Sequence, residues 1–167
     1  MTESKPYSYS RFALQQFRKN KAALWSVYIM IGLLIVGFLS PFLANEKPLY
    51  IKYQQQIFFP AFTFKTYYTF KNENGKEEVQ QIDLIKWKQL KAVAIIWPLV
   101  PYSPFASDLD NANYKSPVDE QYSRDENDAL VNSSWRFRHW LGTGVRGEDV
   151  LSGLIHGASI SLTIGFL

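Results

Sequence analysis

Histidine, cysteine and paired carboxylates are the side chains that most often perform catalysis or bind metals, and this sequence offers few of them. It contains no cysteine, which excludes a thiolate nucleophile, a thiolate zinc site and a disulfide scaffold. Its two histidines, His139 and His156, do not form a His-x-x-x-His or a similar metal-binding spacing. With no nucleophile, acid–base pair or metal site in view, we predict that the chain is not an enzyme and binds no cofactor or metal.

Two groups of acidic residues deserve a separate test, because carboxylates are the usual ligands of calcium. One group is Asp108 and Asp110, and the other is Asp125, Glu126 and Asp128. Both groups lack the glycine and the regularly spaced ligands of a calcium loop. We therefore expect these residues to be solvated loop acids.

A cluster of glycines is the remaining pattern that could indicate a binding site. Gly142, Gly144 and Gly147 lie close together and form a flexible turn. A phosphate-binding loop would need a Gly-Lys-Ser/Thr sequence after a strand, and neither is present. The turn is instead followed by Glu148 and Asp149, whose negative charge suits the N-terminus of a helix.

The elements around these residues are of two kinds, one apolar and one rich in charge. Leu24–Ala44 is a run of 21 residues without a charge, long enough as a helix to span the roughly 30 Å of a bilayer core. Gly32 and Gly37 lie within this run, where small residues allow another helix to approach closely. A cleaved signal peptide is the alternative, but its apolar region is shorter and is followed by a better cleavage site than Phe42–Asn45.

The distribution of charge predicts an orientation. Residues 1–21 carry five basic residues against one acidic residue, whereas residues 46–140 carry twelve of each. Basic residues beside an apolar helix place that end in the cytoplasm, so residues 46–140 are expected outside it. The basic stretch 9–23 is either an amphipathic helix on the membrane surface or a simple topogenic flank. Because no basic patch stands apart from the membrane flank, nucleic-acid binding is not expected.

We expect residues 46–140, the region predicted to lie outside the membrane, to form an α+β or mostly β domain that rests against the membrane surface. Residues 49–53, 56–59 and 61–70 are rich in aromatic and branched side chains, which favour strands. Residues 72–76 form a turn signal, and the spacing of apolar residues over 79–90 predicts a short amphipathic helix. The apolar run 92–97 is predicted to be a buried strand, and the proline-rich and polar stretch 98–134 to be irregular.

The last part of the sequence predicts a second membrane helix. Val150, Leu151, Leu154 and Ile155 mark one helical face, with the small residues Gly153, Gly157, Ala158 and Ser161 beside it. Residues 151–167 are 17 residues without a full charge, fewer than the roughly 20 that a membrane helix needs. We therefore expect the chain to stop inside this helix.

This C-terminal stretch resembles the permease subunits of ABC importers for oligopeptides, dipeptides and nickel. That family carries a segment Leu-Gly-Thr-Asp-x-x-Gly-Arg-Asp-Val-Leu-Ser-Arg, followed by apolar-apolar-Tyr-Gly-Ala-Arg-apolar-Ser-Leu, just before its second membrane helix. Two departures from it matter, because each changes a charge at the turn: Gly144 replaces the usual Asp and Glu148 the usual Arg. The matching residues, which we call the family signature, are Leu141, Gly142, Thr143, Gly147, Asp149, Val150, Leu151, Ser152, Gly157, Ala158, Ser161 and Leu162.

The N-terminal part is similar to the same family. Residues 17–21, Trp25-Ser26 and 43–49 look like the subgroup associated with microcin C and oligopeptide uptake, which also has an enlarged loop between its first two membrane helices. The resemblance implies an α-helical membrane permease with an α+β, strand-rich extracytoplasmic insertion, in the bacterial cytoplasmic (inner) membrane. It also implies a second permease subunit, two cytoplasmic ATPases and an extracytoplasmic substrate-binding protein as partners. The loop that grips the ATPases would lie beyond this sequence.

Four segments follow from these observations. We predict a cytoplasmic basic segment at 1–21, a transmembrane helix at 22–45, an extracytoplasmic domain at 46–140, and the family signature with the truncated start of a second membrane helix at 141–167. The predicted function is that of an N-terminal permease fragment of an ABC transporter importing peptides or related solutes. The alternative is a membrane-anchored extracytoplasmic binding or interaction domain without a role in transport.

Overall fold

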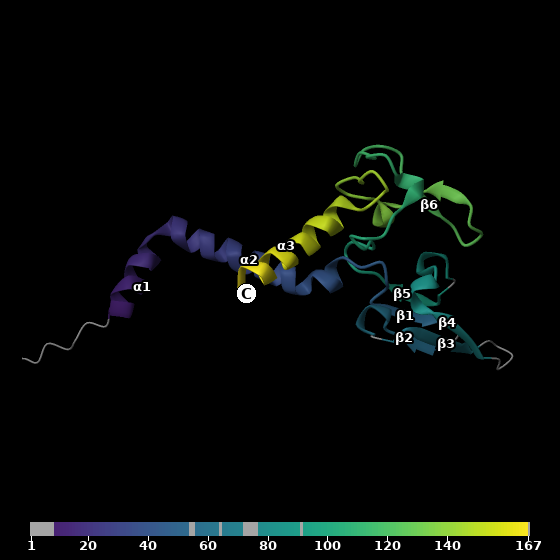
Figure 1. The fold of residues 1–167 in the computed structure, drawn as a ribbon, viewed down its shortest axis with the longest axis horizontal. Helices are drawn as coiled ribbons and strands as arrows, with labels where there is room; N and C mark the ends of the chain where they lie inside the picture. Colours follow the sequence, from purple (N-terminus) through teal and green to yellow (C-terminus); the bar gives the residue numbers. More distant parts are fainter. Residues whose placement is uncertain (1–8, 54–55, 64, 72–76, 91, 167) are drawn as a thin grey trace, which may run out of the picture.

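The chain begins with two helices that meet at a single residue. In the computed structural model, which describes residues 9–53, 56–63, 65–71, 77–90 and 92–166, α1 spans Tyr9–Lys19 and α2 spans Lys21–Leu43 (Figure 1). Asn20 separates them, and its side-chain oxygen accepts a hydrogen bond from the Ala23 N–H at 3.2 Å. An asparagine at this position is a favourable N-cap, so α2 starts before the predicted apolar run. Among the described residues, α2 alone is long and apolar enough to cross a membrane, judged by length and composition.

A globular region of two lobes follows α2, as Figure 1 shows. We call residues 46–100 the sheet lobe and residues 101–149 the loop lobe. The strands of the sheet lobe are β1 (Tyr50–Tyr53), β2 (Gln56–Phe58), β3 (Tyr67–Lys71), β4 (Glu77–Gln81) and β5 (Ala94–Ile96).

The sheet lobe is built from two small antiparallel sheets. One has the strand order β2-β1-β5, and the other is the β3-β4 hairpin. Three 3-10 turns complete the lobe: η1 (Pro60–Phe62), η2 (Ile82–Leu84) and η3 (Trp87–Gln89). Their shared core is mostly aromatic and consists of Ile51, Tyr68, Phe70, Ile82, Ile85, Trp87 and Trp97. The predicted strands at 49–53 and 56–59 are thus confirmed, and the predicted 61–70 run is a strand only in its last part.

The amphipathic helix predicted for residues 79–90 is wrong. Val79 lies in β4, where it pairs with Thr69, and its side chain is exposed. Ile82, Ile85 and Trp87 do turn into the core, but they do so through η2 and η3. A spacing of three residues fits a 3-10 turn as well as an α-helix, and the β3 strand offered the first residues a ladder of hydrogen bonds. The turn predicted at 72–76 lies outside the described residues.

The run at 92–97 forms a strand, as predicted, but not a buried one. β5 pairs with β1 alone, so it is an edge strand, and Ile96 is exposed. Burial begins at the residues that follow it, Trp97 and Pro98. The parallel bridge between Ala44 and Val100 then returns the chain to the end of α2.

The loop lobe is largely irregular, as its prolines predict, although it also contains one short hairpin. This hairpin pairs β6 (Tyr122–Arg124) with β7 (Leu130–Asn132). Two 3-10 turns, η4 (Leu109–Asn111) and η5 (Trp135–Phe137), lie on either side of it. The lobe ends at the glycine-rich turn that leads into the last helix.

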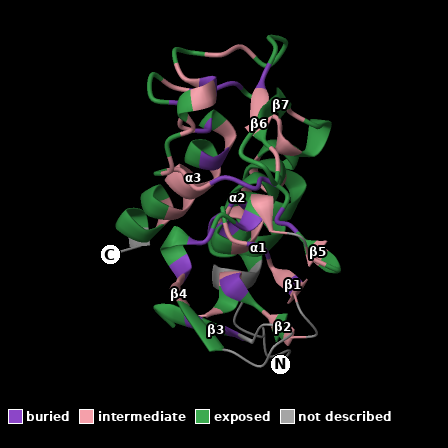
Figure 2. Ribbon diagram, turned by 90° about the vertical axis from the view of Figure 1, so that its right-hand side faces the viewer, coloured by how far each residue is buried: buried purple, intermediate pink, exposed green. Residues whose placement is uncertain are grey.

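The last helix, α3 (Val150–Phe166), runs back across α2. Ala44, Val100 and Tyr102 form a second core cluster at the joint, and Leu151 and Ile155 of α3 pack against it. Further along, Gly37 faces α3 so closely that an added Cβ would lie 3.0 Å from Leu162 Cδ1 and 3.2 Å from Ser159 Cα. The predicted use of a small residue for close helix approach is therefore confirmed at Gly37. Figure 2 shows that α3 is half-buried or exposed beyond its first turn.

The crossing of α2 and α3 can be tested by filling the space at Gly37. Gly37→Val should separate the two helices, because its branched side chain has to displace the α3 backbone, and such overpacking typically costs about 1–3 kcal/mol. Gly32→Val is the matched control, since nothing lies within 4 Å of a Cβ at that position. The measurement is the thermal unfolding midpoint of the chain in detergent micelles. Equal losses for the two variants would contradict the observed crossing.

Candidate functional site

The most tightly organised part of the chain surrounds His139, which is fully buried beside the start of α3. Its Nδ1 lies 2.9 Å from Asp149 Oδ2, and its Nε2 lies 3.2 Å from Asp108 Oδ2. Asp149 is itself buried, whereas the Asp108 side chain keeps about a quarter of its surface exposed. The imidazole ring therefore joins two carboxylates that are far apart in the sequence.

The geometry determines the charge on this ring. A carboxylate only accepts hydrogen bonds, so two carboxylate neighbours require both ring nitrogens to donate, and only the protonated ring does so. Burial lowers the pKa of His139, but its hydrogen bonds to Asp108 and Asp149 and their negative charge outweigh burial and raise the pKa above the ordinary 6.5. Burial likewise raises the pKa of Asp108, and the hydrogen bonds from His139 and Asn111 outweigh it, leaving that pKa below 3.8.

Aromatic stacking covers the ring from one side. Tyr102 stacks on His139 with ring centroids 4.0 Å apart, and the Tyr102 hydroxyl donates to the Phe137 carbonyl at 2.6 Å. The Lys88 ammonium lies 3.6 Å above the Tyr102 ring centroid. Tyr102 thus touches a cation on either side, an arrangement that the negative face of an aromatic ring favours. Burial and the charges of Asp108 and Asp149 raise the pKa of Tyr102, so its hydroxyl remains a donor.

A cleft of about 520 Å³ separates the two lobes at this point. Trp87 and Lys88 line it from the sheet lobe, and Tyr102 and Asp108 line it from the loop lobe. Although Lys88 is exposed as a residue, its ammonium is enclosed here. Burial lowers the pKa of Lys88 to about 8, with Asp108 and Glu46 opposing this effect by their charge.

Asp149 also begins α3. Its Oδ1 accepts a hydrogen bond from the Ser152 backbone N–H at 2.6 Å, which satisfies one of the free donors at the start of the helix. The Ser152 hydroxyl donates to the Tyr102 carbonyl at 2.9 Å, and one turn later His156 Nε2 lies 2.8 Å from the Ala44 carbonyl. The helix is thereby tied to the loop lobe and to the end of α2 at once.

Two glycines make the close approaches of the turn possible. Gly142 and Gly147 have φ angles of +79° and +84°, a conformation that side chains disfavour. A Cβ on Gly142 would lie 2.4 Å from the Lys115 carbonyl oxygen, and one on Gly147 would lie 1.8 Å from that of Asp108. The prediction of a glycine-dependent turn is therefore confirmed, and the reason is packing of the turn against the loop lobe.

Buried polar side chains fix the loop lobe to this turn. The Thr143 hydroxyl donates to the Asn111 carbonyl at 2.6 Å and accepts from the Lys115 N–H at 3.0 Å. Asn111 donates to Asp108 Oδ2 at 3.0 Å and pairs with the Tyr122 backbone. Gln121 pairs in the same way with the His139 backbone. The side-chain amides of Asn111 and Gln121 thus satisfy backbone groups that strand pairing would satisfy in a sheet.

The two departures from the family pattern lie next to each other. An added Cβ on Gly144 would be 2.8 Å from Glu148 Oε2, and the Gly144 N–H donates to the Glu148 carbonyl at 2.8 Å. The Glu148 carboxylate instead accepts from Arg146, with Nε 2.6 Å from Oε1. In this chain an acid at 148 thus has a cation at 146 and no side chain at 144, and we predict that the two departures compensate for each other.

The signature residues fall into three groups in the structure. Gly142, Thr143, Gly147, Asp149 and Ser152 are buried around the turn, and Leu151 packs on the cluster at the end of α2. Leu162 lies at the crossing with Gly37, and Gly157 and Ala158 are half-buried. Leu141, Val150 and Ser161 are exposed.

Not all of the acidic residues that we predicted to be solvated loop acids are solvated in the structure. Asp108 takes part in the buried site, which contradicts the prediction for it. Asp110 forms a two-pronged ion pair with Arg124 at 2.7 and 2.8 Å, and Asp128 accepts from Gln89 at 2.8 Å. Asp125 accepts from the Asn127 and Ala129 N–H groups, the usual task of an aspartate in a turn. No three metal-ligating side chains converge in the part of the chain that the structure describes.

Sequence reasoning did not identify the buried ion site. A histidine and an acid on either side of a glycine-rich turn, as with His139 and Asp149, would have been a usable signal. No local signal existed for Asp108 or Tyr102, which the folding of the loop lobe brings to His139, or for Lys88, which the packing of the two lobes brings to Tyr102.

Comparison with known proteins shows which permeases this chain resembles. Residues 8–67 match the N-terminal TM domain of oligopeptide transport permease C. The resemblance to the permease subunits of peptide-type ABC importers is confirmed by this match and by the two relatives described next. These relatives are also consistent with the microcin C and oligopeptide uptake subgroup.

The chain is similar to two proteins in particular. It is 24% identical, over its whole length and 44% of the relative's, to the inner membrane ABC transporter permease protein YejE of Escherichia coli. It is also 24% identical, over 90% of its length and 42% of the relative's, to the peptidoglycan transport system permease protein YejE of Agrobacterium fabrum. The chain thus spans less than half the length of these relatives. No solved structure matches it.

The buried ion site predicts how stability varies with pH. The raised pKa of His139 contributes stability that is full below pH 6.5 and is lost as pH rises through the raised value. The lowered pKa of Asp108 contributes stability present above pH 3.8 and lost as pH falls through the lowered value. We expect the thermal unfolding midpoint, followed by tryptophan fluorescence in micelles, to be highest between these two pH values.

The variant His139→Gln should remove the loss of stability on the alkaline side. It should also cost on the order of 3 kcal/mol, because the buried Asp149 and the half-buried Asp108 lose their common cation. His156→Gln changes the other histidine of the chain and is the matched control. An alkaline loss that persists in His139→Gln but disappears in His156→Gln would refute this assignment.

The compensation between positions 144 and 148 can be tested with a double-mutant cycle. Gly144→Asp should destabilise the chain, because the new carboxylate lies beside that of Glu148. Glu148→Arg should also destabilise it by placing a second cation beside Arg146. The double variant restores the family's pair of residues, so it should be more stable than the sum of the single changes indicates. Additive changes in the unfolding midpoint would show that the two positions are independent.

Proposed function

We propose that this chain is the N-terminal part of the transmembrane permease subunit of an ABC transporter that imports peptides or related solutes. The observation that carries the proposal is the similarity to YejE permeases over the whole chain. The match of residues 8–67 to an oligopeptide permease domain supports it independently of the C-terminal signature. These similarities weigh against the alternative of an anchored binding domain without a role in transport.

The proposed topology follows the distribution of charge and apolar surface. Residues 1–21 lie in the cytoplasm, residues 22–45 cross the bacterial inner membrane, and residues 46–140 form an extracytoplasmic insertion. Residues 141–167 carry the family signature and start the second membrane helix. The 23-residue α2 and the basic residues before it support this arrangement.

The proposed partners are those that a permease of this class requires. A second permease subunit would complete the pathway, and two cytoplasmic ATPases would bind parts of the protein beyond this chain. A substrate-binding protein would dock on the extracytoplasmic side. ATP hydrolysis would then belong to separate subunits, and this chain would perform no catalytic step of its own.

In this proposal the signature residues are positioning residues. They hold the first turn of α3 against the end of α2 and against the loop lobe, through Asp149, Ser152 and the glycine turn. A movement of one membrane helix would therefore be transmitted to the lobes outside, and the reverse. Such a connection would couple the lobes to the helix movements by which a permease opens its pathway to one side of the membrane and then to the other.

Uptake measurements test the proposal. In cells that carry the intact gene as their sole copy, Asp149→Ala should reduce uptake of a labelled oligopeptide to near the level of a deletion strain. The reason is that the variant leaves His139 without its buried partner and α3 without its cap. Leu141→Ala is the matched control, since Leu141 belongs to the same signature but is exposed, and it should retain uptake.

Immunoblotting of membrane fractions separates loss of transport from loss of the protein. A deletion strain that takes up oligopeptides and peptidoglycan-derived peptides as well as the parent strain does would refute the transport proposal. Normal uptake by Asp149→Ala would refute the positioning role alone.

A further inference from the structure

A stripe of phenylalanines runs from α2 onto the sheet lobe. Phe38 and Phe42 are one turn apart and therefore lie on the same face of α2. The Phe42 ring stacks on Phe62 of η1 with centroids 5.0 Å apart, and Phe62 meets Phe59 at 6.5 Å. We call these four residues the aromatic stripe. It joins the membrane helix to the lobe without a polar side chain between the rings.

Three of the four residues of the aromatic stripe are exposed although they are apolar, and the fourth, Phe42, is half-buried. The exposed fractions are 82% for Phe38, 51% for Phe59 and 55% for Phe62. The lobe has a well-packed aromatic core nearby, in which Phe58 touches Tyr68 and Phe70. Phe59 and Phe62 stay outside this core. A contiguous exposed apolar surface of this kind marks a contact with a membrane or another protein.

The backbone holds the stripe at the point where α2 ends. The Ala61 N–H in η1 donates to the Pro48 carbonyl at 3.2 Å, and Leu49 donates to the Ile96 carbonyl at 2.8 Å. In the same region, the Asn45 N–H donates to the Val100 carbonyl at 3.1 Å, and the Val100 N–H donates to the Leu43 carbonyl at 2.9 Å. The position of Phe59 and Phe62 relative to α2 is therefore fixed by the fold.

We infer that the aromatic stripe seats the sheet lobe in the outer leaflet of the lipid bilayer, with Phe59 and Phe62 at the headgroup–acyl boundary. The occupant of this surface is phospholipid, because the stripe is continuous with the face of α2 that α3 leaves uncovered. α3 packs at Gly37, whereas the adjacent Phe38 is among the most exposed residues of the helix. Apolar aromatic side chains are well suited to this depth of the bilayer.

Seating the lobe would set its tilt relative to the membrane. The sheet lobe is one wall of the cleft that contains Lys88, and the loop lobe that forms the other wall is fixed to α3. Lipid contact on the sheet lobe and helix contact on the loop lobe would then together determine the width of the cleft. The inference rests on the proposed function to the extent that α2 must cross a membrane.

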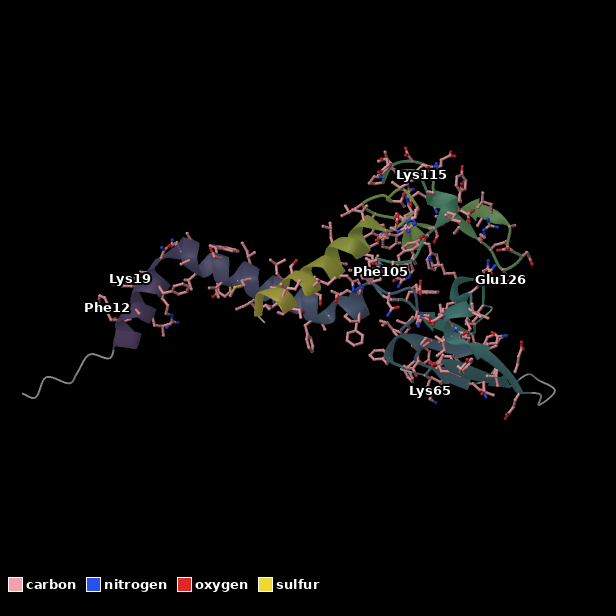
Figure 3. All side chains as sticks on the ribbon, viewed as in Figure 1. Phe12, Lys19, Lys65, Phe105, Lys115 and Glu126 are labelled. Carbon is pink, nitrogen blue, oxygen red and sulfur yellow. The ribbon has the colours of Figure 1, made fainter. Side chains whose placement is uncertain are left out.

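The chain has no cysteine, so a single introduced cysteine can be labelled without background. The chain is reconstituted in phosphatidylcholine vesicles, and an environment-sensitive fluorophore is attached to Phe62→Cys. A fraction of the lipid carries a nitroxide near the headgroup. Leu130→Cys is the matched control, because Leu130 is exposed to 53%. It lies in β7, close to Glu126, which Figure 3 places at the end of the molecule far from the helices.

The label at position 62 should be quenched by the nitroxide lipid several-fold more strongly than the label at position 130, and it should be protected from iodide in the water. Phe59→Cys provides a second reporter if Phe62→Cys fails to fold, as judged by its unfolding transition. Quenching no stronger at positions 59 and 62 than at position 130 would overturn the inference, whether the sites are then open to iodide or covered by protein.

A label at Phe38→Cys distinguishes the two proposals. Quenching at position 38 without quenching at positions 59 and 62 would overturn the seating of the lobe and leave the permease proposal intact. A lack of quenching at position 38 would show that α2 does not cross the membrane, and both proposals require that it does.

Discussion

A buried imidazolium between two carboxylates is the interaction on which the arrangement of this chain depends. Moving a charge out of water is costly unless it is paired and hydrogen-bonded, and His139 meets that condition only when Asp108 and Asp149 are both in place. Asp108 lies in the body of the loop lobe, whereas Asp149 is the last residue of that lobe and caps the start of α3. The site therefore requires the loop lobe, the glycine turn and α3 to be folded together.

The neighbours of this site also connect it to α2 and α3. Tyr102 stacks on His139, and its carbonyl accepts from Ser152 in α3. Val100, two residues earlier, is paired with the end of α2 through the Leu43 carbonyl. The region between the two helices therefore holds the end of α2 and the start of α3 together.

Positions 144 and 148 of the glycine-rich turn depart from the family pattern, and the turn is nevertheless well formed. The position that carries an Arg in related permeases holds Glu148, and the position that carries an Asp holds Gly144. The two positions are adjacent in space in this chain: the acid at 148 pairs with Arg146, and a side chain at 144 would meet the Glu148 carboxylate. The signature residues around the turn that match the family pattern, Gly142, Thr143, Gly147, Asp149 and Ser152, are the buried ones.

The sequence by itself determined the elements whose signals are local. The apolar run gave α2, since length and lack of charge suffice to define such a helix. Strand residues at 49–59 and the glycine turn were likewise predictable from side-chain type. The family signature was readable as well, because its residues lie within one short stretch, 141–162.

Only the tertiary structure decided the elements that depend on a partner elsewhere in the chain. The segment 79–90 became a strand and two 3-10 turns because β3 supplied hydrogen bonds and the aromatic core accepted Ile82 and Trp87. Asp108 became part of a buried ion site, and not a solvated acid, because the loop lobe folds back onto His139. Ion pairs between residues that are far apart in the sequence leave no local pattern. The partners of a charged residue therefore appear only when the chain is folded.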